Sequence, residues 1–427
     1  MFRPRPGFLV RLIRFFVILL FFSLATACDT WIEAARAPFL PTITPEPIVP
    51  TATAPGNAQD QEGATPAAQS SPSPPATHTP IHQRPSPPPL ATISPTPRQT
   101  PTSPVNNEME TVEIDELTRF GVGIARPFDY LEAAVDAGLI VGAALDWNVR
   151  LRPPAVPLQF WQMIRIGEMG IRKVDWPELA DAIAANPGAY WMVGNEPDVK
   201  WQDNVTPASY AHIYHDVYYF IKEHDPTAQV VIGGVAQPTP LRRAYLDIVL
   251  DTYEEAYGEP MPVDIWNVHA FILREEADSW GVDIPPGMDG EQGMLYEIED
   301  HDNMEIFDQN LRDFRRWMAE RGYGDKPLVV SEYGILMPSD YGFPEEDVIT
   351  FMTATLDYFR EARGGDGFAP DDGRLVQWWF WYSLFEDQLY PTGNLWDPDN
   401  GRLTPLGAAW SAYIAENTTA TAQPPPP

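Results

Sequence analysis

Short apolar runs alternate with amphipathic segments between residues 120 and 414, and this alternation predicts the fold. The apolar runs indicate eight strands, at residues 120–125, 140–147, 161–166, 190–196, 229–235, 263–271, 327–335 and 376–384. Apolar residues with helical spacing fill most of the intervals, at 176–186, 207–224, 241–257, 305–321 and 345–363. Because strands that alternate with helices pair in parallel through right-handed crossovers, the pattern indicates the α/β class.

Two α/β architectures give this alternation, an open doubly wound sheet and a closed (β/α)8, or TIM, barrel. Gly121-Val122-Gly123 lies within the first strand, and the third Gly of a dinucleotide-binding loop is missing. Thr404-Pro405 starts a last helix, with Thr at the N-cap and Pro in the first turn. We therefore expect a TIM barrel over residues 108–417, a length that suits a single barrel.

The first 28 residues have the pattern of a signal peptide. Four arginines precede an apolar run at residues 15–27, which is shorter than the roughly 20 residues that a spanning helix needs. The run ends in Ala25-Thr26-Ala27-Cys28, which resembles a bacterial lipobox, although Leu24 stands four places before the Cys rather than three. We expect a secreted protein held on the outside of the bacterial membrane by lipidated Cys28. The alternative is an uncleaved anchor, or an ordinary signal with an incidental Cys.

Residues 29–107 have the composition of a tether. Nineteen of the 47 prolines lie between residues 38 and 104, among Thr, Ser, Ala and Gln, with almost no aromatic residues. Such a segment buries too little apolar surface to offset the entropy of ordering, so we expect a disordered, extended spacer. The tail, residues 418–427, ends in four prolines and is expected to be disordered as well.

Charge excludes several kinds of partner. The formal net charge is −32, and residues 1–107 contribute +2 from seven Arg and five acidic residues, so the remainder carries −34. Nucleic acid and an anionic membrane surface would be repelled, which leaves the N-terminal lipid or signal as the expected membrane contact. One cysteine excludes an intrachain disulfide framework and a Cys-rich zinc site.

Two of the predicted strands end in a glutamate. The fourth contains Gly194-Asn195-Glu196-Pro197, and the seventh contains Ser331-Glu332-Tyr333-Gly334. In barrels of this kind the chemistry lies at the carboxyl ends of the strands, and strands four and seven face each other across the mouth. Burying an unpaired carboxylate among apolar strand residues costs free energy, so a glutamate in such a strand indicates a functional role. Two facing carboxyls are the groups that cleavage of a glycosidic bond needs.

These motifs resemble the signatures of the large clan of retaining (β/α)8 glycoside hydrolases with glutamates on strands four and seven. The phrase from Asn186 to Pro197 is especially similar to glycosyl hydrolase catalytic-core proteins, a group that includes some β-1,3-glucanases. The resemblance covers the domain from Phe120 to Ile414. It implies a glycosidase with Glu196 as general acid/base and Glu332 as nucleophile, and with Asn195 bound to the sugar 2-hydroxyl.

Further residues are expected to contact the sugar or to orient the carboxyls. His269 at the end of strand six would hydrogen-bond the nucleophile or a sugar hydroxyl, and Tyr333 after the nucleophile would orient a carboxylate or line the cleft. On strand eight, alternation puts Trp379 and Trp381 on one face and Trp378, Phe380 and Tyr382 on the other. Related enzymes use a Trp here as a subsite floor, and Trp381 is the expected one. The expected cleft walls are Asp146, Trp147 and Trp201.

The expected substrate is therefore a neutral β-linked polysaccharide or oligosaccharide, cleaved by a monomer without metal or cofactor. The alternative is a barrel that binds glycan at the cell surface without cleaving it. A metal-dependent hydrolase ranks last, because the close histidine pair of the folded part, His212 and His215, lies on a predicted helix. Residues 273–303 form a long acidic insertion after strand six, expected to be a solvated loop rather than a lid or a calcium site.

Overall fold

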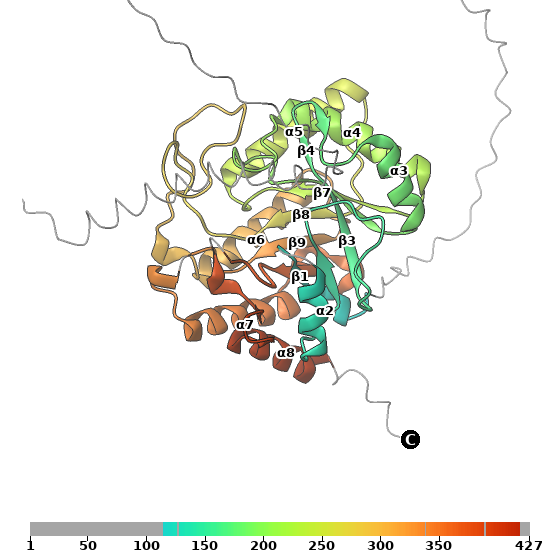
Figure 1. Ribbon diagram of the computed structural model, residues 1–427. Coiled ribbons are helices and arrows are strands. Elements are labelled where there is room, and N and C mark those ends of the chain that lie inside the picture. Colours follow the sequence, from blue (N-terminus) through green and yellow to red (C-terminus); the bar gives the residue numbers. More distant parts are fainter. Residues whose placement is uncertain (1–113, 126–127, 338, 388–389, 419–427) are drawn as a thin grey trace, which may run out of the picture. The chain divides into compact units, whose positions relative to one another are not determined.

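The computed structural model describes residues 114–125, 128–337, 339–387 and 390–418, and it contains the barrel that the alternation predicts (Figure 1). Each of the eight predicted strands is present. The barrel strands are β1 (Phe120–Gly123), β2 (Ala143–Leu145), β3 (Gln159–Ile164), β6 (Tyr190–Asn195), β7 (Gln229–Gly234), β8 (Trp266–His269), β9 (Leu328–Tyr333) and β11 (Trp378–Trp381).

These strands form one parallel sheet that nearly closes on itself. Hydrogen-bonded neighbours follow the order β7-β6-β3-β2-β1-β11-β9-β8. The last gap, between β7 and β8, is bridged at two isolated parallel positions, Val231–Ile265 and Val235–Val268. The glutamate motifs therefore stand on the fourth and seventh strands of a ring, as the sequence predicts.

Helices cover the outside of the ring, with α3, α4 and α5 on one side and α6, α7 and α8 on the other (Figure 1). Their bounds are α2 (Phe128–Asp136), α3 (Trp176–Ala185), α4 (Pro207–His224), α5 (Pro240–Tyr257), α6 (Met304–Glu320), α7 (Glu345–Glu361) and α8 (Pro405–Thr418). The predicted start of α8 is confirmed, because the Thr404 hydroxyl accepts a hydrogen bond from the Gly407 N–H at 3.0 Å. The sequence analysis did not predict α2.

Smaller elements decorate the barrel, and the sequence analysis did not predict them. The short strands are β4 (Ile166–Gly167), β5 (Gly170–Ile171), β10 (Arg363–Phe368), β12 (Trp396–Asp397) and β13 (Arg402–Leu403). The 3₁₀ helices are η1 (Leu117–Arg119), η2 (Ile298–Asp300), η3 (Ser339–Tyr341), η4 (Ala369–Asp371) and η5 (Pro391–Gly393). Strands β4 and β5 form a two-stranded antiparallel hairpin directly after β3.

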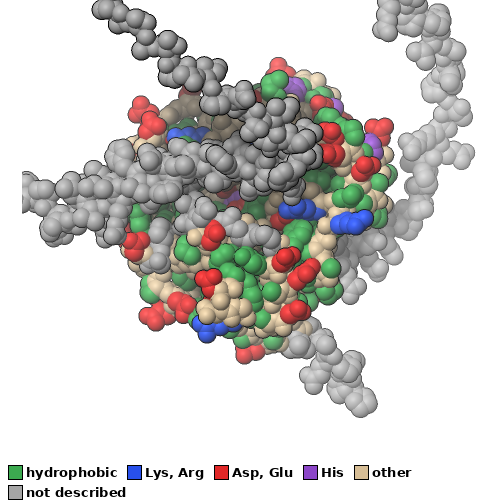
Figure 2. Space-filling model, in the orientation of Figure 1, with side chains coloured by type: hydrophobic (Ala, Val, Ile, Leu, Met, Phe, Trp, Pro, Cys, Tyr) green, Lys and Arg blue, Asp and Glu red, His purple; other side chains and the backbone are tan. Residues whose placement is uncertain are grey.

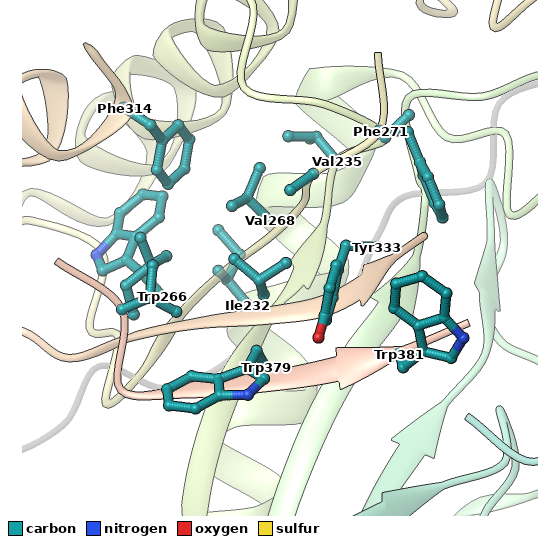
Figure 3. Close-up of a cluster of buried hydrophobic side chains, with 14 of the residues drawn as sticks. Ile232, Val235, Trp266, Val268, Phe271, Phe314, Tyr333, Trp379 and Trp381 are labelled. Atoms are coloured by element: carbon teal, nitrogen blue, oxygen red, sulfur yellow. The ribbon is translucent and has the colours of Figure 1, made fainter. Parts of the chain in front are cut away.

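Alternation along the strands divides the hydrophobic residues into two cores. A small cluster fills the barrel interior and includes Trp161, Met192, Trp378 and Phe380. A large cluster lies between strands and helices, and Figure 3 shows part of it, with Trp266, Trp379 and Phe314 among the labelled side chains. Such packing leaves the carboxyl ends of the strands as the place where polar side chains gather.

The insertion at 273–303 is only in part the solvated acidic loop that the sequence analysis expected, because most of its acidic residues are exposed or half-buried but two are buried. Glu275 is fully buried and forms an ion pair with Arg242, whose side chain is also fully buried, with a Nε–Oε1 distance of 3.1 Å. Asp283 is 7% exposed and pairs with Lys200. Because a buried carboxylate is tolerated only when it is paired, these contacts fix the insertion to the barrel.

The described surface is acidic, and Figure 2 shows acidic side chains at many separate places on one face and few basic ones. Among the residues with described coordinates, none belongs to a helix long and apolar enough to cross a membrane. The expected signal peptide, Cys28, the tether at 29–107 and the end of the tail lie outside the described residues.

Candidate active site

Glu196 and Glu332 meet at the carboxyl end of the barrel. Glu196 follows the last residue of β6, and Glu332 is the fifth of the six residues of β9. Their side chains each bring one carboxylate oxygen to within 4.8 Å of the other, and both residues are less than 10% exposed. The two motifs that lie 136 positions apart in the sequence thus form one site.

His269, the last residue of β8, lies between the two glutamates. Its Nδ1 is 3.0 Å from Glu196 Oε1, and its Nε2 is 3.6 Å from Glu332 Oε1. The ring fits because residue 234 on β7 is a glycine: a Cβ there would lie 2.6 Å from the His269 Cδ2. Although burial opposes it, the charges of Glu332 and Glu196 raise the pKa of His269.

Trp147 supplies a hydrogen bond to the second glutamate. Its indole Nε1 donates to Glu332 Oε1 at 2.6 Å, from a residue just past the end of β2. Trp147 has a φ of 56°, a left-handed conformation that aims the ring across the mouth of the barrel. Its ring also packs edge to face against Tyr382, with the ring centroids 5.7 Å apart.

Burial sets the protonation of Glu332. It raises the pKa of Glu332 to about 7, with a further increase from the charge of Glu196. His269 and the Trp147 donor act in the opposite direction and favour the ionised carboxylate. Two facing carboxyls in a buried site cannot both be charged at low cost, which is why the pKa of Glu332 lies well above that of an exposed glutamate.

Three more of the expected site residues lie near the mouth. Asn195 is 2% exposed, and its side-chain amide donates to Gln202 Oε1 at 3.3 Å, while its Oδ1 has no hydrogen-bond partner. Asp146 is held by Arg150, with 2.5 Å between Nη2 and Oδ2. Trp201 is half-buried, and the Lys200 ammonium stands 4.1 Å from its ring centroid. Their contact with sugar stays a prediction.

The predictions for Tyr333 and Trp381 were wrong. Both side chains are fully buried, and Figure 3 shows them among hydrophobic neighbours. Their ring centroids lie 5.2 Å apart. The Trp381 indole donates to the Gly393 carbonyl at 2.7 Å, and Tyr333 packs edge to face on Phe359 of α7. They point outward between strand and helices, so neither can line the mouth.

The aromatic residue that β11 brings to the mouth is Tyr382. Trp378 and Phe380 fill the barrel interior, and Tyr382 continues their face beyond the end of the strand. The alternation along the strand had separated the two faces correctly, but the wrong one was assigned to the mouth. Tyr390 was missed as well: burial, followed by the charge of Glu196, raises its pKa.

Glu196, His269 and Glu332 are also the set of three possible metal ligands found among the described residues. They offer two carboxylate oxygens and an imidazole nitrogen, a donor set that zinc accepts. His212 and His215 serve packing between α4 and α5 instead, since the His215 ring stacks on Tyr257 with centroids 3.7 Å apart. A test of function must therefore include metal removal.

Comparisons with known proteins gave structural matches only. No family model and no curated protein matched the sequence. One similar structure is an endo-β-1,3-glucanase of glycoside hydrolase family 128 from Pseudomonas viridiflava, at 18% identity and a TM-score of 0.47. The match covers 69% of this chain and 97% of that chain.

Two further structures of family 128 have other described roles. One is a curdlan-specific exo-β-1,3-glucanase from Blastomyces gilchristii, with 16% identity, a TM-score of 0.47, and coverage of 70% of this chain and 99% of that one. The other is an oligosaccharide-binding protein from Cryptococcus neoformans, with 16% identity, a TM-score of 0.46, and coverage of 72% and 98%. Glycoside hydrolases, the class that the two glutamate motifs resemble, are thus among the solved structures similar to this chain.

Proposed function

We propose that this chain is a retaining glycoside hydrolase that cleaves a neutral β-linked glycan. The observation that carries the proposal is the pair Glu196 and Glu332 at the carboxyl end of the barrel, with carboxylate oxygens within 4.8 Å of each other. Retaining enzymes hold their carboxyls about 5–5.5 Å apart, whereas inverting enzymes need about 6.5–9.5 Å to admit a water. The shorter separation supports double displacement.

The reaction runs in two steps. In the first, the ionised carboxylate of Glu332 attacks the anomeric carbon, the glycosidic bond breaks, and Glu196 gives its proton to the leaving oxygen. In the second, Glu196 takes a proton from water, the hydroxyl adds to the anomeric carbon, and the bond to Glu332 breaks. Each glutamate returns to its starting protonation.

The neighbours of the two glutamates suit these roles. Burial raises the pKa of Glu332 to about 7, and the Trp147 donor at 2.6 Å opposes that rise by favouring the ionised form, which a nucleophile needs. His269, 3.0 Å from Glu196, can hold the acid/base in place through both steps. Asn195 directly precedes the acid/base, and its side-chain oxygen is buried without a hydrogen-bond partner. In the proposed role this oxygen would turn toward the substrate and accept a hydrogen bond from the sugar 2-hydroxyl.

The test is an assay of reducing-sugar release by the purified protein over a panel of neutral polysaccharides. The panel includes a β-1,3-glucan, the substrate named for the similar hydrolase structures. We expect release from at least one member and retention of anomeric configuration by proton NMR. Inversion of configuration would refute double displacement.

Two controls separate the rival functions. A protein that binds glycan without cleaving it would show saturable binding by calorimetry and no release with any substrate. Hydrolysis that is lost in EDTA and restored by Zn²⁺ would instead identify the Glu196, His269 and Glu332 cluster as a metal site. The proposed mechanism requires activity that is unaffected by the chelator.

We also propose that the enzyme acts outside the cell, as a monomer tethered through lipidated Cys28. The composition of residues 1–107 supports this proposal. Metabolic labelling with a fatty acid should mark the wild-type protein and not Cys28→Ala, which should be released from the membrane fraction. A single-chain mass in light scattering of the purified protein would support the monomer.

A further inference from the structure

Glu196 has an unusual backbone conformation. Its φ is 43°, in the left-handed region that costs a residue with a side chain about 1–3 kcal/mol. The preceding Gly194 also has a positive φ, of 94°. The chain therefore leaves β6 through a bend that the rest of the structure must stabilise. The loop that follows, residues 196–203, carries the candidate acid/base at its start.

Asp203 holds one end of this loop. Its side chain is fully buried, and its Oδ2 accepts hydrogen bonds from the N–H groups of Asn195, at 2.8 Å, and Ile166, at 3.1 Å. Its Oδ1 accepts from Arg165 Nε at 2.6 Å and Arg172 Nη2 at 2.8 Å. One carboxylate thus ties the peptide next to Glu196 to the β4–β5 hairpin.

Asp198 holds the other side. It is fully buried and pairs with Arg242, with 2.9 Å between Nη1 and Oδ2. The same oxygen accepts from the Ala236 N–H at 3.3 Å, and Arg242 Nη1 also donates to the Asp198 carbonyl at 2.7 Å. Arg242 reaches Glu275 of the insertion with its Nε. Because this arginine is itself fully buried, its position is fixed on every side.

Between these two contacts the loop is short and closed by backbone hydrogen bonds. The Val199 N–H donates to the Glu196 carbonyl at 3.0 Å, and the Asp203 N–H donates to the Asn195 carbonyl at 3.3 Å. A shift of either aspartate side chain would therefore move the backbone of Glu196, because only a few covalent and hydrogen bonds separate them. Catalysis is sensitive to such movement, since a misplacement of about 1 Å can cost about 100-fold in rate.

We propose that Asp198 and Asp203 are positioning residues, which together keep Glu196 in its left-handed conformation with its carboxyl aimed at the leaving oxygen. This inference rests on the proposed function for the role of Glu196. It assigns to the two buried ion pairs a task in proton transfer in addition to any contribution to stability.

The kinetic test uses Asp198→Asn and Asp203→Asn, which keep side-chain size and remove one charge. The substrates are the phenyl and the 2,4-dinitrophenyl β-glycosides of the sugar released from the panel. Departure of phenol needs a proton from Glu196, whereas dinitrophenolate leaves without one. We expect kcat/KM, which reports the first step alone, to fall about 10–100-fold for the phenyl glycoside and less than about threefold for the dinitrophenyl glycoside.

The control is Asp251→Asn on α5, which removes an exposed partner of Arg321 and should leave both rates as in the wild type. Equal losses on both glycosides would overturn the proposal, because a general structural defect affects both reactions alike. Unchanged rates on both glycosides would overturn it too.

A second measurement does not depend on activity. In crystal structures of the two variants we expect residue 196 to leave the left-handed region or its carboxyl to move away from His269. If both variants keep a positive φ at residue 196 and the 3.0 Å contact with His269, the inference is wrong. A wild-type protein that cleaves neither glycoside nor any panel polysaccharide would instead refute the proposed function, and the structures would still decide the inference.

Discussion

The two carboxylates of the candidate site are held by different kinds of structure. Glu332 belongs to strand β9, where it pairs with His269 of β8, and the register of β9 with both β8 and β11 shifts just before this part of the strand. Glu196 lies just beyond its strand, at a positive φ, and is bracketed by the ion pairs of Asp198 and Asp203. Sheet geometry places the proposed nucleophile, whereas side-chain contacts outside the sheet place the proposed acid.

The difference has a physical basis. A nucleophile attacks one atom along one line, so a rigid strand suits it. An acid/base must first reach the leaving oxygen and then an incoming water, on the side of the bond away from the nucleophile. A loop anchored at both ends can present a carboxyl in that direction, which no residue of a straight strand could do.

The largest effects are expected when each carboxyl is removed in turn, which tests whether the two glutamates have different roles. Glu332→Ala and Glu196→Ala should each lose at least about 1000-fold in kcat on the glycan. With azide and a dinitrophenyl β-glycoside, Glu332→Ala should give the α-glycosyl azide and Glu196→Ala the β-glycosyl azide, as identified by proton NMR. The same anomer from both variants would show that the roles are assigned wrongly.

Stability should respond to the burial of Glu332. Its pKa is raised from 4.5 to about 7, so the native state binds this proton more tightly than the unfolded state. Protonated Glu332 therefore stabilises the native state at low pH. As pH rises from about 4.5 to about 7, the free energy of unfolding falls by about 3 kcal/mol through this group. Glu332→Gln should melt several degrees above the wild type at about pH 8 and close to it at about pH 4. Equal melting temperatures at the higher pH would contradict the raised pKa.

A smaller effect is expected from Trp147→Phe. The indole donor favours the ionised form of Glu332, so its loss should raise the pKa of Glu332 further. The acid limb of kcat/KM, expected near pH 7 in the wild type, should move to higher pH, with about a tenfold loss at its plateau. A lower rate with an unmoved acid limb would mean that Trp147 acts on substrate binding alone.

The smallest effect is expected from the exposed part of the insertion. Glu297 is 65% exposed and pairs with Arg274 at 2.7 Å, so Glu297→Gln should change the free energy of unfolding by less than about 1 kcal/mol and leave activity unchanged. Glu275→Gln, at the buried end of the same insertion, should cost more, because it leaves Arg242 with fewer charges to pair. Equal effects from the two variants would show that the insertion is not fixed through Arg242.

Much of the site could be predicted from local sequence. The motifs around Glu196 and Glu332 mark strand ends, and period-two alternation on the last strand separated two aromatic faces correctly. It could not say which face turned inward, because both are equally apolar. Trp381 was therefore placed at the mouth in error, where the structure has Tyr382.

The ion pairs around Glu196 were beyond prediction for another reason. Asp203 meets Arg165 across 38 positions, and Asp198 meets Arg242 across 44, with no spacing rule to connect them. The same holds for Glu275, which the acidic composition of its segment had suggested was in water. Burial of a charge depends on what the fold brings against it, and composition alone does not reveal this.

The sequence by itself determined the eight strands, their parallel order and the two glutamates that end the fourth and seventh, since each follows from short-range periodicity. The tertiary structure alone decided how near the two carboxyls come, which aromatic ring reaches the mouth and which arginines hold the loop of Glu196. Those features depend on contacts between residues that are distant in the chain. Such contacts form only when the barrel folds and brings those residues together.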